Sequence, residues 1–450
     1  MKFNVRPVVA YYSKQYSWWS QPAKEEMFQR VKMYIKRLKN FLEKMEPNIE
    51  LLEPVVISSI DDLYSYHIRE EVVKEADAIL AINAGLGSQP VLVSLGDLGL
   101  PIVIVGFMSL VMGKSAEGFP GPEALDAYGE LRRRGILVKL AVGLDDIISA
   151  LRIFRCIKAL RETKIIAFGT PASYIKDVIT PIEYLERRMG VQIIVIALEE
   201  LLNEYKKVAY EDVKERANEL IKMAKCIDGF KEDYRKAIED SIRLYIAMKN
   251  FIKRYNANAV TIDCFGFMDL IYRSVKIHRP PCIPLALLRD EGIPAACEAD
   301  LDALMTMIIL SILSGKPAFM GNPTYMAPHK GIIRISHCTA PLSILKEYEI
   351  VSFHESGYGA TIRGYFKEGE VVTIARMAKF LSEMIITTGI IVRSKIEKTA
   401  ECATRVEVRI TNAREFVNKI VGDHHVMVLG DWRRELCDIC DILGVRAVIL

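Results

Sequence analysis

The feature that most constrains this chain is an alternation between short apolar runs rich in β-branched residues and longer amphipathic stretches. The first half carries such runs at 6–13, 51–59, 76–85 and 100–106. The stretch 23–45, which follows the first run, has the hydrophobic spacing of a helix. Strands that alternate with helices form parallel sheets covered by helices on both faces. The pattern therefore predicts a doubly wound α/β domain.

The same alternation restarts after a predicted helix at 144–161. Strand-like runs recur at 163–169, 191–197 and 258–266, and a long charged helical region at 211–256 separates the last two. A second parallel sheet with its own helices is the simplest explanation of a restarted pattern. We therefore expect a second α/β domain in the middle of the chain.

The spacing of the apolar runs changes after about residue 340. Closely spaced strand-like runs with glycine turns and little helix fill 349–392, and the last forty residues return to strand, helix and strand. Such runs are typical of an antiparallel sandwich or small barrel. The predicted fold is thus α/β, with two doubly wound parallel-sheet domains followed by a β-rich, antiparallel, barrel-like C-terminal domain. The expected boundaries are 1–155, 156–335 and 336–450.

Charge and hydropathy exclude several classes of partner. The net charge is +3, with acids and bases interspersed, so we expect no nucleic-acid partner. The longest apolar run, 304–313, is shorter than the roughly 18 residues of a membrane helix, so we expect no membrane partner. The N-terminus lacks the parts of a secretory signal, and the nine cysteines lack framework spacing. These observations predict a cytoplasmic location.

One acidic cluster opens an apolar helix in the segment 292–326. Glu298 lies at the entry of this helix, Asp302 follows at i+4 and is expected to share its face, and Asp300 is expected to point elsewhere. Acids favour a helix N-terminus because of the helix dipole, which is one explanation of the cluster. The other is that a carboxylate at the edge of a buried helix needs a partner such as a metal ion.

Two adjacent histidines stand in a strand-like apolar run near the C-terminus, "IVGDHHVMVLGDW". Neighbouring residues of a strand point to opposite faces, so His424 and His425 are not expected to bind one ion together. We expect one of them to be a ligand and the other to hold a neighbour or face substrate.

Three further residues have an ordinary structural explanation beside a functional one. His337 ends a predicted strand, where a hydrogen-bonded histidine is common. Cys338 beside it has no second cysteine at metal-ligand spacing and is interpreted as packing. Asn322 precedes Pro323, which is ordinary turn chemistry.

Taken together, these segments resemble the L-fucose isomerase and L-arabinose isomerase superfamily. The matching pieces are "CEADLDALMTMIILSILSGKPAFM", "GNPTYM", "ISHCTAP" and "GDHHVMVLGD". The resemblance is specific from about residue 290 to the end and architectural over the N-terminal half. It implies a metal-dependent aldose–ketose isomerase that acts on a monosaccharide, fucose-like, arabinose-like or modified, through an enediol.

The resemblance also implies roles for particular residues. Glu298 matches the first metal-binding carboxylate, His425 the C-terminal histidine ligand, and His337 the additional histidine of the arabinose branch. Asn322 stands where the family has Asp or Glu. An amide oxygen can bind a hard cation, but it cannot act as a base. A proton relay then needs a substitute, for which Asp302, Asp300, His424 and a metal-bound water are candidates.

The remaining expectations concern the ion, the assembly and the pocket. The implied ligands suit Mn²⁺, with Co²⁺ or Zn²⁺ as alternatives. Members of the superfamily assemble as homotrimers or homohexamers, and a neighbouring N-terminal domain helps to close the pocket. Trp18 and Trp19 follow the first strand, where they would stack on a sugar or form a structural aromatic cluster.

Two other functions remain open at this point. An epimerase or an aldolase-type enzyme would use the same ligands, because both reactions also pass through a metal-stabilised enediolate or enolate. A non-catalytic sugar-binding protein would use the paired α/β lobes for ligand closure.

Overall fold

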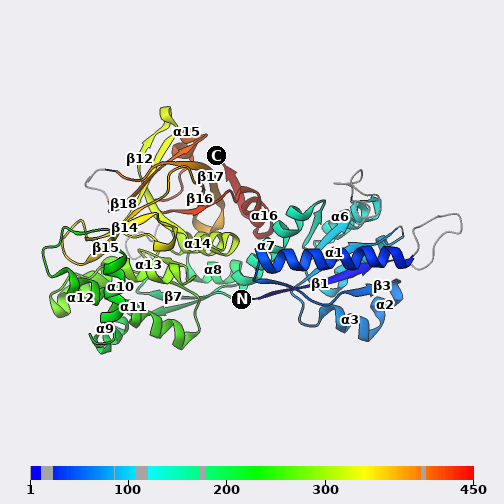
Figure 1. Ribbon diagram of the computed structural model, residues 1–450, viewed down its shortest axis with the longest axis horizontal. Helices are drawn as coiled ribbons and strands as arrows, with labels where there is room; N and C mark the ends of the chain where they lie inside the picture. The colour runs from blue at the N-terminus through cyan, green and yellow to red at the C-terminus, as the bar shows by residue number, and fades with distance from the viewer. Residues whose placement is uncertain (1, 12–23, 86, 107–119, 172–178, 397–401) are drawn as a thin grey trace. The chain divides into compact units, whose positions relative to one another are not determined.

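The structure is a computed structural model that describes residues 2–11, 24–85, 87–106, 120–171, 179–396 and 402–450. The chain divides into two units, Met1–Ile157 and Lys158–Leu450, which are drawn in Figure 1. The predicted division into three domains stays a prediction.

The first unit is built on a parallel sheet of six strands. Its order is β2-β1-β4-β5-β6, and β3 pairs with β1 beyond the end of β2. The strands are β1 (Phe3–Ala10), β2 (Ile49–Leu51), β3 (Val55–Ile57), β4 (Ala78–Asn83), β5 (Ile102–Gly106) and β6 (Val138–Ala141). Side chains of β1 and β4 are buried almost without interruption, as expected for strands covered on both faces.

Helices cover both faces of this sheet. The elements are α1 (Lys24–Met45), α2 (Ile60–Tyr64), α3 (Tyr66–Val73), α4 (Gln89–Ser94), α6 (Pro122–Arg133) and α7 (Leu144–Arg161). Apolar side chains of α2, α3, α4 and α6 form one core with the strands. Helix α1 lies on the opposite side of the sheet from α2 and α3 (Figure 1).

The second unit begins with a smaller parallel sheet in the order β11-β10-β7-β8. Its strands are β7 (Lys164–Phe168), β8 (Gln192–Ile196), β10 (Ala259–Ile262) and β11 (Ala295–Ala296). The accompanying helices are α8 (Ile182–Met189), α9 (Leu198–Lys207), α10 (Lys214–Met223), α11 (Tyr234–Tyr255), α12 (Cys264–Val275) and α13 (Cys282–Asp290). The chain leaves β11 directly before Cys297 and Glu298.

A closed barrel of six antiparallel strands follows in the second unit. Its order is β16-β19-β12-β13-β18-β17, and pairing of β16 with β17 closes it. The strands are β12 (Phe319–Ala327), β13 (Ile332–His337), β16 (Val371–Met377), β17 (Glu383–Arg393), β18 (Thr404–Ile410) and β19 (His425–Leu429). A further strand, β20 (Arg446–Ile449), pairs in parallel with β17.

Smaller elements complete this part of the chain. A three-stranded sheet has the order β15-β14-β9. The elements are β9 (Ile227–Asp228), β14 (Glu347–Ser352), β15 (Ala360–Tyr365), α15 (Ala413–Lys419) and α16 (Arg433–Leu443).

One helix joins the small sheet to the barrel. Helix α14 (Leu301–Ser314) contacts β10 and β11 on one side and β16 and β19 on the other. It is apolar almost all round and buried over most of its length, and it ends at Gly315, where φ is +64°.

The predicted fold class is confirmed by the two parallel sheets and the barrel. In the described ranges, every helix is too short or too polar to span a lipid bilayer.

Candidate active site

Two consecutive residues before α14 adopt the left-handed backbone conformation. Glu298 has φ +58° and Ala299 has φ +54°. The turn is held by the Glu298 amide, which donates to Cys264 Sγ at 3.3 Å, and by the Ala299 amide, which donates to Ile262 O at 2.9 Å. Non-glycine residues pay roughly 1–3 kcal/mol each for sparsely populated backbone regions, and such residues gather at functional sites. The turn aims the Glu298 side chain away from the axis of α14.

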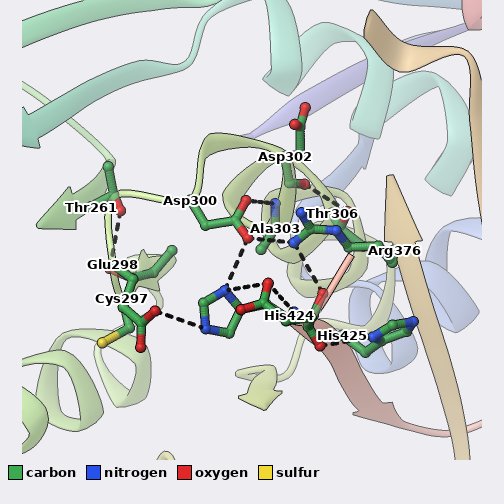
Figure 2. Close-up of polar contacts among 12 residues, drawn as sticks. Thr261, Cys297, Glu298, Asp300, Asp302, Ala303, Thr306, Arg376, His424 and His425 are labelled. Atoms are coloured by element: carbon green, nitrogen blue, oxygen red, sulfur yellow. Dashed lines mark hydrogen bonds and ion pairs between the residues drawn. The ribbon is translucent and has the colours of Figure 1, made fainter. Parts of the chain in front are cut away.

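Asp300 connects this turn to the barrel. Its Oδ1 accepts the Ala303 amide at 2.9 Å and so caps α14. Its Oδ2 accepts from Arg376 Nη1 of β16 and lies 3.0 Å from His424 Nδ1 (Figure 2). Burial opposes the charge of this carboxylate, but Arg376 and His424 hold its pKa far below the usual range. Asp300 is therefore an ionised group inside the protein.

His424 lies between two carboxylates. Its Nδ1 faces Asp300, and its Nε2 is 3.6 Å from Glu298 Oε2 (Figure 2). Burial alone would lower the pKa of His424, but the contacts with Asp300 and Glu298 raise it to about 10. Within the described ranges, His424 Nε2 is buried without a hydrogen-bond partner. This nitrogen is therefore positioned for a group that the protein itself does not supply.

Arg376 holds both members of the Asp300–His424 pair. Its Nη1 donates to the Asp300 carboxylate and, at 3.0 Å, to the backbone carbonyl of His424. Gly422 is packed against the guanidinium, because a Cβ at this position would lie 2.9 Å from Arg376 Nε. The glycine two residues before His424 is thus required by close packing against Arg376.

Glu298 also borders a second buried imidazole. The rings of His337 and His424 have centroids 5.5 Å apart. Burial, together with the neighbouring charge of His424, lowers the pKa of His337 to about 3, so its ring is neutral. Its Nδ1 is buried and has no hydrogen-bond partner in the described part of the chain. A neutral imidazole with an unused nitrogen is a suitable metal ligand.

Two groups of side chains that could hold a metal ion share Glu298. One consists of Cys297, Glu298 and His337, and the other of Glu298, Asp423 and His424. In each group the ligand atoms lie within 4.8 Å of one another. Asp423 also accepts the His424 amide at 2.8 Å, so its carboxylate is fixed beside the imidazole. The predicted residues Glu298, His337 and His424 are therefore brought together.

The two adjacent histidines face different surroundings, as strand alternation predicts. His425 packs its ring against Phe416, with centroids 5.1 Å apart, and its Nδ1 donates to Asp423 O at 3.2 Å. Figure 2 shows its ring directed away from Glu298, toward which His424 points. The expectation that His425 lies with Glu298 is thus corrected in favour of His424. The reason is that His425 shares its face of β19 with Met427 and contacts Phe416, and both of these residues belong to the barrel core.

The expected pairing of Glu298 with Asp302 is also wrong. Helical i, i+4 spacing does not apply, because Glu298 and Ala299 have left-handed backbone angles and the helix begins only at Leu301. Asp302 instead accepts the Thr180 amide at 2.9 Å and the Thr180 hydroxyl at 2.6 Å. Asp300, which was expected to point elsewhere, is the acid that contacts His424.

Asn322 lies on β12, between the strands that carry the histidines. Its backbone is paired with Ser336, the residue before His337, and the preceding Gly321 is paired with His425. Its Oδ1 is buried without a hydrogen-bond partner among the described residues. Its role as a ligand stays a prediction. Trp18 and Trp19 lie outside the described residues.

Sequence reasoning missed two residues of this site and misplaced a third. Arg376 lies in an ordinary strand pattern and gives no signal. Asp423 directly precedes the histidine pair in the sequence, but an acid before a strand is a common surface feature and gave no reason to propose it as a site residue. Asp300 was named as a candidate for the proton relay but was expected to point elsewhere, and only the unusual backbone at Glu298 determines which acid of the cluster faces the histidine.

Comparison with known proteins gives one partial likeness. The chain matches no family model. It is 26% identical over 220 residues to the sulfoquinovose isomerase of Clostridium sp. (strain MSTE9), and the match covers 46% of this chain and 47% of that protein. The chain thus spans about half the length of the curated relative that it matches.

Proposed function

We propose that the protein is an aldose–ketose isomerase that acts on a monosaccharide with the help of a divalent metal ion. The observation that carries the proposal is the chain Glu298–His424–Asp300, in which a buried imidazole lies between the partly buried Glu298 and the buried Asp300, and Asp423 adjoins it. The partial likeness to a sulfoquinovose isomerase supports the same class of reaction.

Asp423 is the proposed replacement for the carboxylate that the resemblance implies at position 322. The resemblance implies two carboxylates at the metal, and an amide stands at the second position. Asp423 has a carboxylate oxygen within 4.8 Å of ligand atoms of both Glu298 and His424. In this proposal Asp423 takes over the role of the missing carboxylate, and Glu298 and Asp423 form the acid–base pair.

The donor set fits a divalent ion. Glu298, Asp423, His424 and His337 would hold it, because two of the imidazole nitrogens involved are buried without another partner among the described residues. Carboxylate oxygen and imidazole nitrogen suit Mn²⁺, and they also accept Co²⁺ or Zn²⁺. When bound, such an ion supplies Lewis-acid stabilisation of negative charge on the sugar oxygens.

Asp300 and Arg376 position His424 for this role. Asp300 accepts the Nδ1 proton of His424, so Nε2 is the nitrogen that faces Glu298, and a bound metal ion would take the place of the Nε2 proton. Arg376 keeps Asp300 ionised and also holds the backbone of His424. The contacts of Arg376 with Asp300, and of Asp300 with His424, therefore fix both the tautomer and the direction of the His424 ring.

The carboxylates then move the protons of the isomerisation. One carboxylate removes the proton from C2 of the open-chain aldose, and the released electron pair forms the C1–C2 double bond while O1 is protonated. The resulting enediol loses the proton of O2, the C2 carbonyl forms, and C1 receives a proton from the same carboxyl group. The second carboxylate carries the proton between O2 and O1. The sum is an isomerisation without any external oxidant or reductant.

An aldose panel tests the proposal. Purified protein reconstituted with Mn²⁺, Co²⁺ or Zn²⁺ is incubated with neutral, acidic and deoxy aldoses and with sulfoquinovose, and products are identified by NMR. A ketose formed only with metal supports the proposal. A C2 epimer or smaller fragments would instead identify an epimerase or an aldolase-type enzyme.

The Glu298→Gln variant separates catalysis from simple sugar binding. We expect it to lose bound metal and ketose formation, while Glu370→Gln, a barrel carboxylate that pairs with Lys367, retains both. If purified protein binds no metal and Glu298→Gln binds sugars like the unmodified protein, the chain is a sugar-binding protein without isomerase activity.

The assembly and location belong to the same proposal. A homotrimer or homohexamer and a cytoplasmic location are implied by the resemblance, and light scattering of the purified chain tests the first. Contacts of Trp18 and Trp19 with sugar likewise stay predictions.

A further inference from the structure

A second group of potential ligands lies at the end of β13 and β18 where His337 is paired with Thr404. It consists of Cys338, His354 and Cys402, whose ligand atoms all lie within 4.8 Å of one another. The Cys338 and Cys402 sulfurs are 3.3 Å apart, and Cys338 Sγ lies 3.9 Å from His354 Nδ1. None of these residues is needed for the proposed isomerase mechanism.

The topology explains why residues so far apart in sequence meet. His337 and Thr404 are paired across β13 and β18, so Cys338 and Cys402 extend from the same end of this strand pair. The Thr404 hydroxyl donates to Ile362 O of β15 at 2.7 Å and accepts the Gly364 amide at 2.9 Å. These bonds hold the β14–β15 hairpin against β18, and His354 lies in the turn of that hairpin.

We propose that Cys338, His354 and Cys402 form a binding site for a thiophilic divalent ion, of which Zn²⁺ is the natural candidate. Two thiolates and one neutral imidazole balance the charge of the ion and match its preference for sulfur and nitrogen. Three protein ligands leave one of the four tetrahedral positions of zinc open. This site is separate in its ligands from the Glu298 site, and it does not rest on the proposed isomerase activity.

The second nitrogen of His354 supports this assignment. Its Nε2 faces Glu355 Oε1 at 3.9 Å, while its Nδ1 faces Cys338. Metal-bound histidines commonly direct their other nitrogen to a carboxylate, which fixes the ring and its tautomer. The adjacent residues His354 and Glu355 thus form the arrangement expected around a metal ion.

The thiols themselves do not have the properties of a catalytic nucleophile. A hydrogen bond with Cys338, followed by burial, raises the pKa of Cys402 far above its usual range. Reactive cysteines have a lowered pKa instead.

Cobalt titration tests the site directly. The full chain is reduced and stripped of metal, and Co²⁺ is added while thiolate-to-cobalt charge-transfer absorption is recorded. We expect a band whose final amplitude corresponds to one thiolate-bound Co²⁺ per chain, beyond any Co²⁺ taken up at the Glu298 site, and which disappears when Zn²⁺ is added. Cys338→Ser and Cys402→Ser should lose the band, and Cys226→Ser, which removes an exposed cysteine outside the cluster, should keep it. A band that persists in both cluster variants would overturn the proposal.

Three further measurements keep the outcome independent of folding and of the Glu298 site. Glu298→Gln should keep the charge-transfer band, whether or not the protein is an isomerase. Glu355→Gln should weaken Co²⁺ binding roughly ten- to a hundredfold. In the unmodified protein, Zn²⁺ should protect Cys338 and Cys402, but not Cys226, from alkylation followed by mass spectrometry. Equal alkylation with and without Zn²⁺, or a Cys338–Cys402 disulfide in protein that takes up no metal after reduction, would contradict the site.

Discussion

The charge on Asp300 controls the neighbourhood of Glu298. This buried carboxylate contacts Arg376, His424 and the first turn of α14 at once. Removing one member of a buried ion pair leaves the other charge uncompensated, which typically costs about 3–5 kcal/mol. Replacing Asp300 would also remove the acceptor that fixes the His424 tautomer.

Asp300→Asn should therefore affect both metal binding and stability. We expect metal affinity at the Glu298 site to fall about ten- to a hundredfold, because the acceptor of the His424 Nδ1 proton is weakened. Isothermal titration with Mn²⁺ measures the affinity, and thermal unfolding measures the stability. Asp302→Asn is the matched control, since Asp302 contacts Thr180 and not His424. Equal metal affinity in the two variants would contradict the role of Asp300.

Asp423→Asn tests the proposed second carboxylate. An amide cannot accept a proton, so ketose formation should fall by about two to four orders of magnitude, the usual contribution of acid–base catalysis. The control is Asp431→Asn, because Asp431 lies in the same segment but forms a surface ion pair with Arg433. Turnover of Asp423→Asn similar to that of Asp431→Asn would remove Asp423 from the mechanism.

At this scale the sequence predicted which residues lie together better than how they are arranged. Glu298, His337 and His424 were all identified, and the alternation of a strand predicted that His424 and His425 separate. The assignment of the two rings failed because alternation does not say which face is the core. The pairing of Glu298 with Asp302 failed because a left-handed turn before α14 has no signature in non-glycine residues.

Among the elements, the segment directly before β19 connects the barrel to the start of α14. Gly422, Asp423 and His424 follow one another in this segment, and each contacts a different part of the site. Gly422 allows the Arg376 guanidinium to lie directly against the backbone. Helix α14 contributes the matching side through its capping residue Asp300.

Gly422→Ala should disturb this junction without changing any charge. The added methyl group would lie 2.9 Å from Arg376 Nε and Nη2, so the buried guanidinium must shift. Overpacking of this kind costs about 1–3 kcal/mol. We expect a lower unfolding temperature and at least a roughly tenfold loss of ketose formation if Arg376 positions His424.

The control for this substitution is Gly143→Ala, where a Cβ meets nothing within 4 Å. Circular dichroism on heating and a turnover assay compare the two variants. If Gly422→Ala unfolds and turns over like Gly143→Ala, the close contact with Arg376 has no energetic importance.

At the scale of the whole molecule, a buried acid links stability to pH. Burial, and then the charge of Asp300, raises the pKa of Asp302 from 3.8 to about 7, against the opposing hydrogen bonds from Thr180. The folded protein therefore holds a proton that the unfolded chain releases between about pH 4 and pH 7. The contribution of Asp302 to stability is present below this window and is lost as pH rises through it.

Asp302→Asn should remove this part of the pH dependence. Relative to the unmodified protein, the variant should gain unfolding temperature as pH increases from about 4 to about 7, and the difference should level off above that window. Thermal unfolding at closely spaced pH values measures the difference. A difference that is constant with pH would show that Asp302 does not hold a proton in the folded state.

The sheets of the molecule could be predicted from the sequence, but the barrel order could not. Local alternation of strands and helices determines the parallel sheets, because neighbouring units in sequence are close in space. The barrel pairs β12 with β19, which are about a hundred residues apart in the chain, and nothing local encodes that pairing. The candidate site depends on this pairing, so its residues could be proposed from sequence while their contacts could not.

The most direct test of the central claim is NMR of the reaction in D₂O. Protein loaded with Mn²⁺ is incubated with sulfoquinovose and with the neutral and deoxy aldoses of the panel, and each position of the product is assigned. If Glu298 and Asp423 transfer protons through an enediol, the carboxyl proton will exchange with solvent over repeated turnovers, deuterium will build up at C1 of the ketose and at C2 of the recovered aldose, and Asp423→Asn will form neither at a measurable rate. A mixture of aldose and ketose that reaches equilibrium and still carries no deuterium on either carbon, as expected for direct hydrogen transfer, would contradict the account.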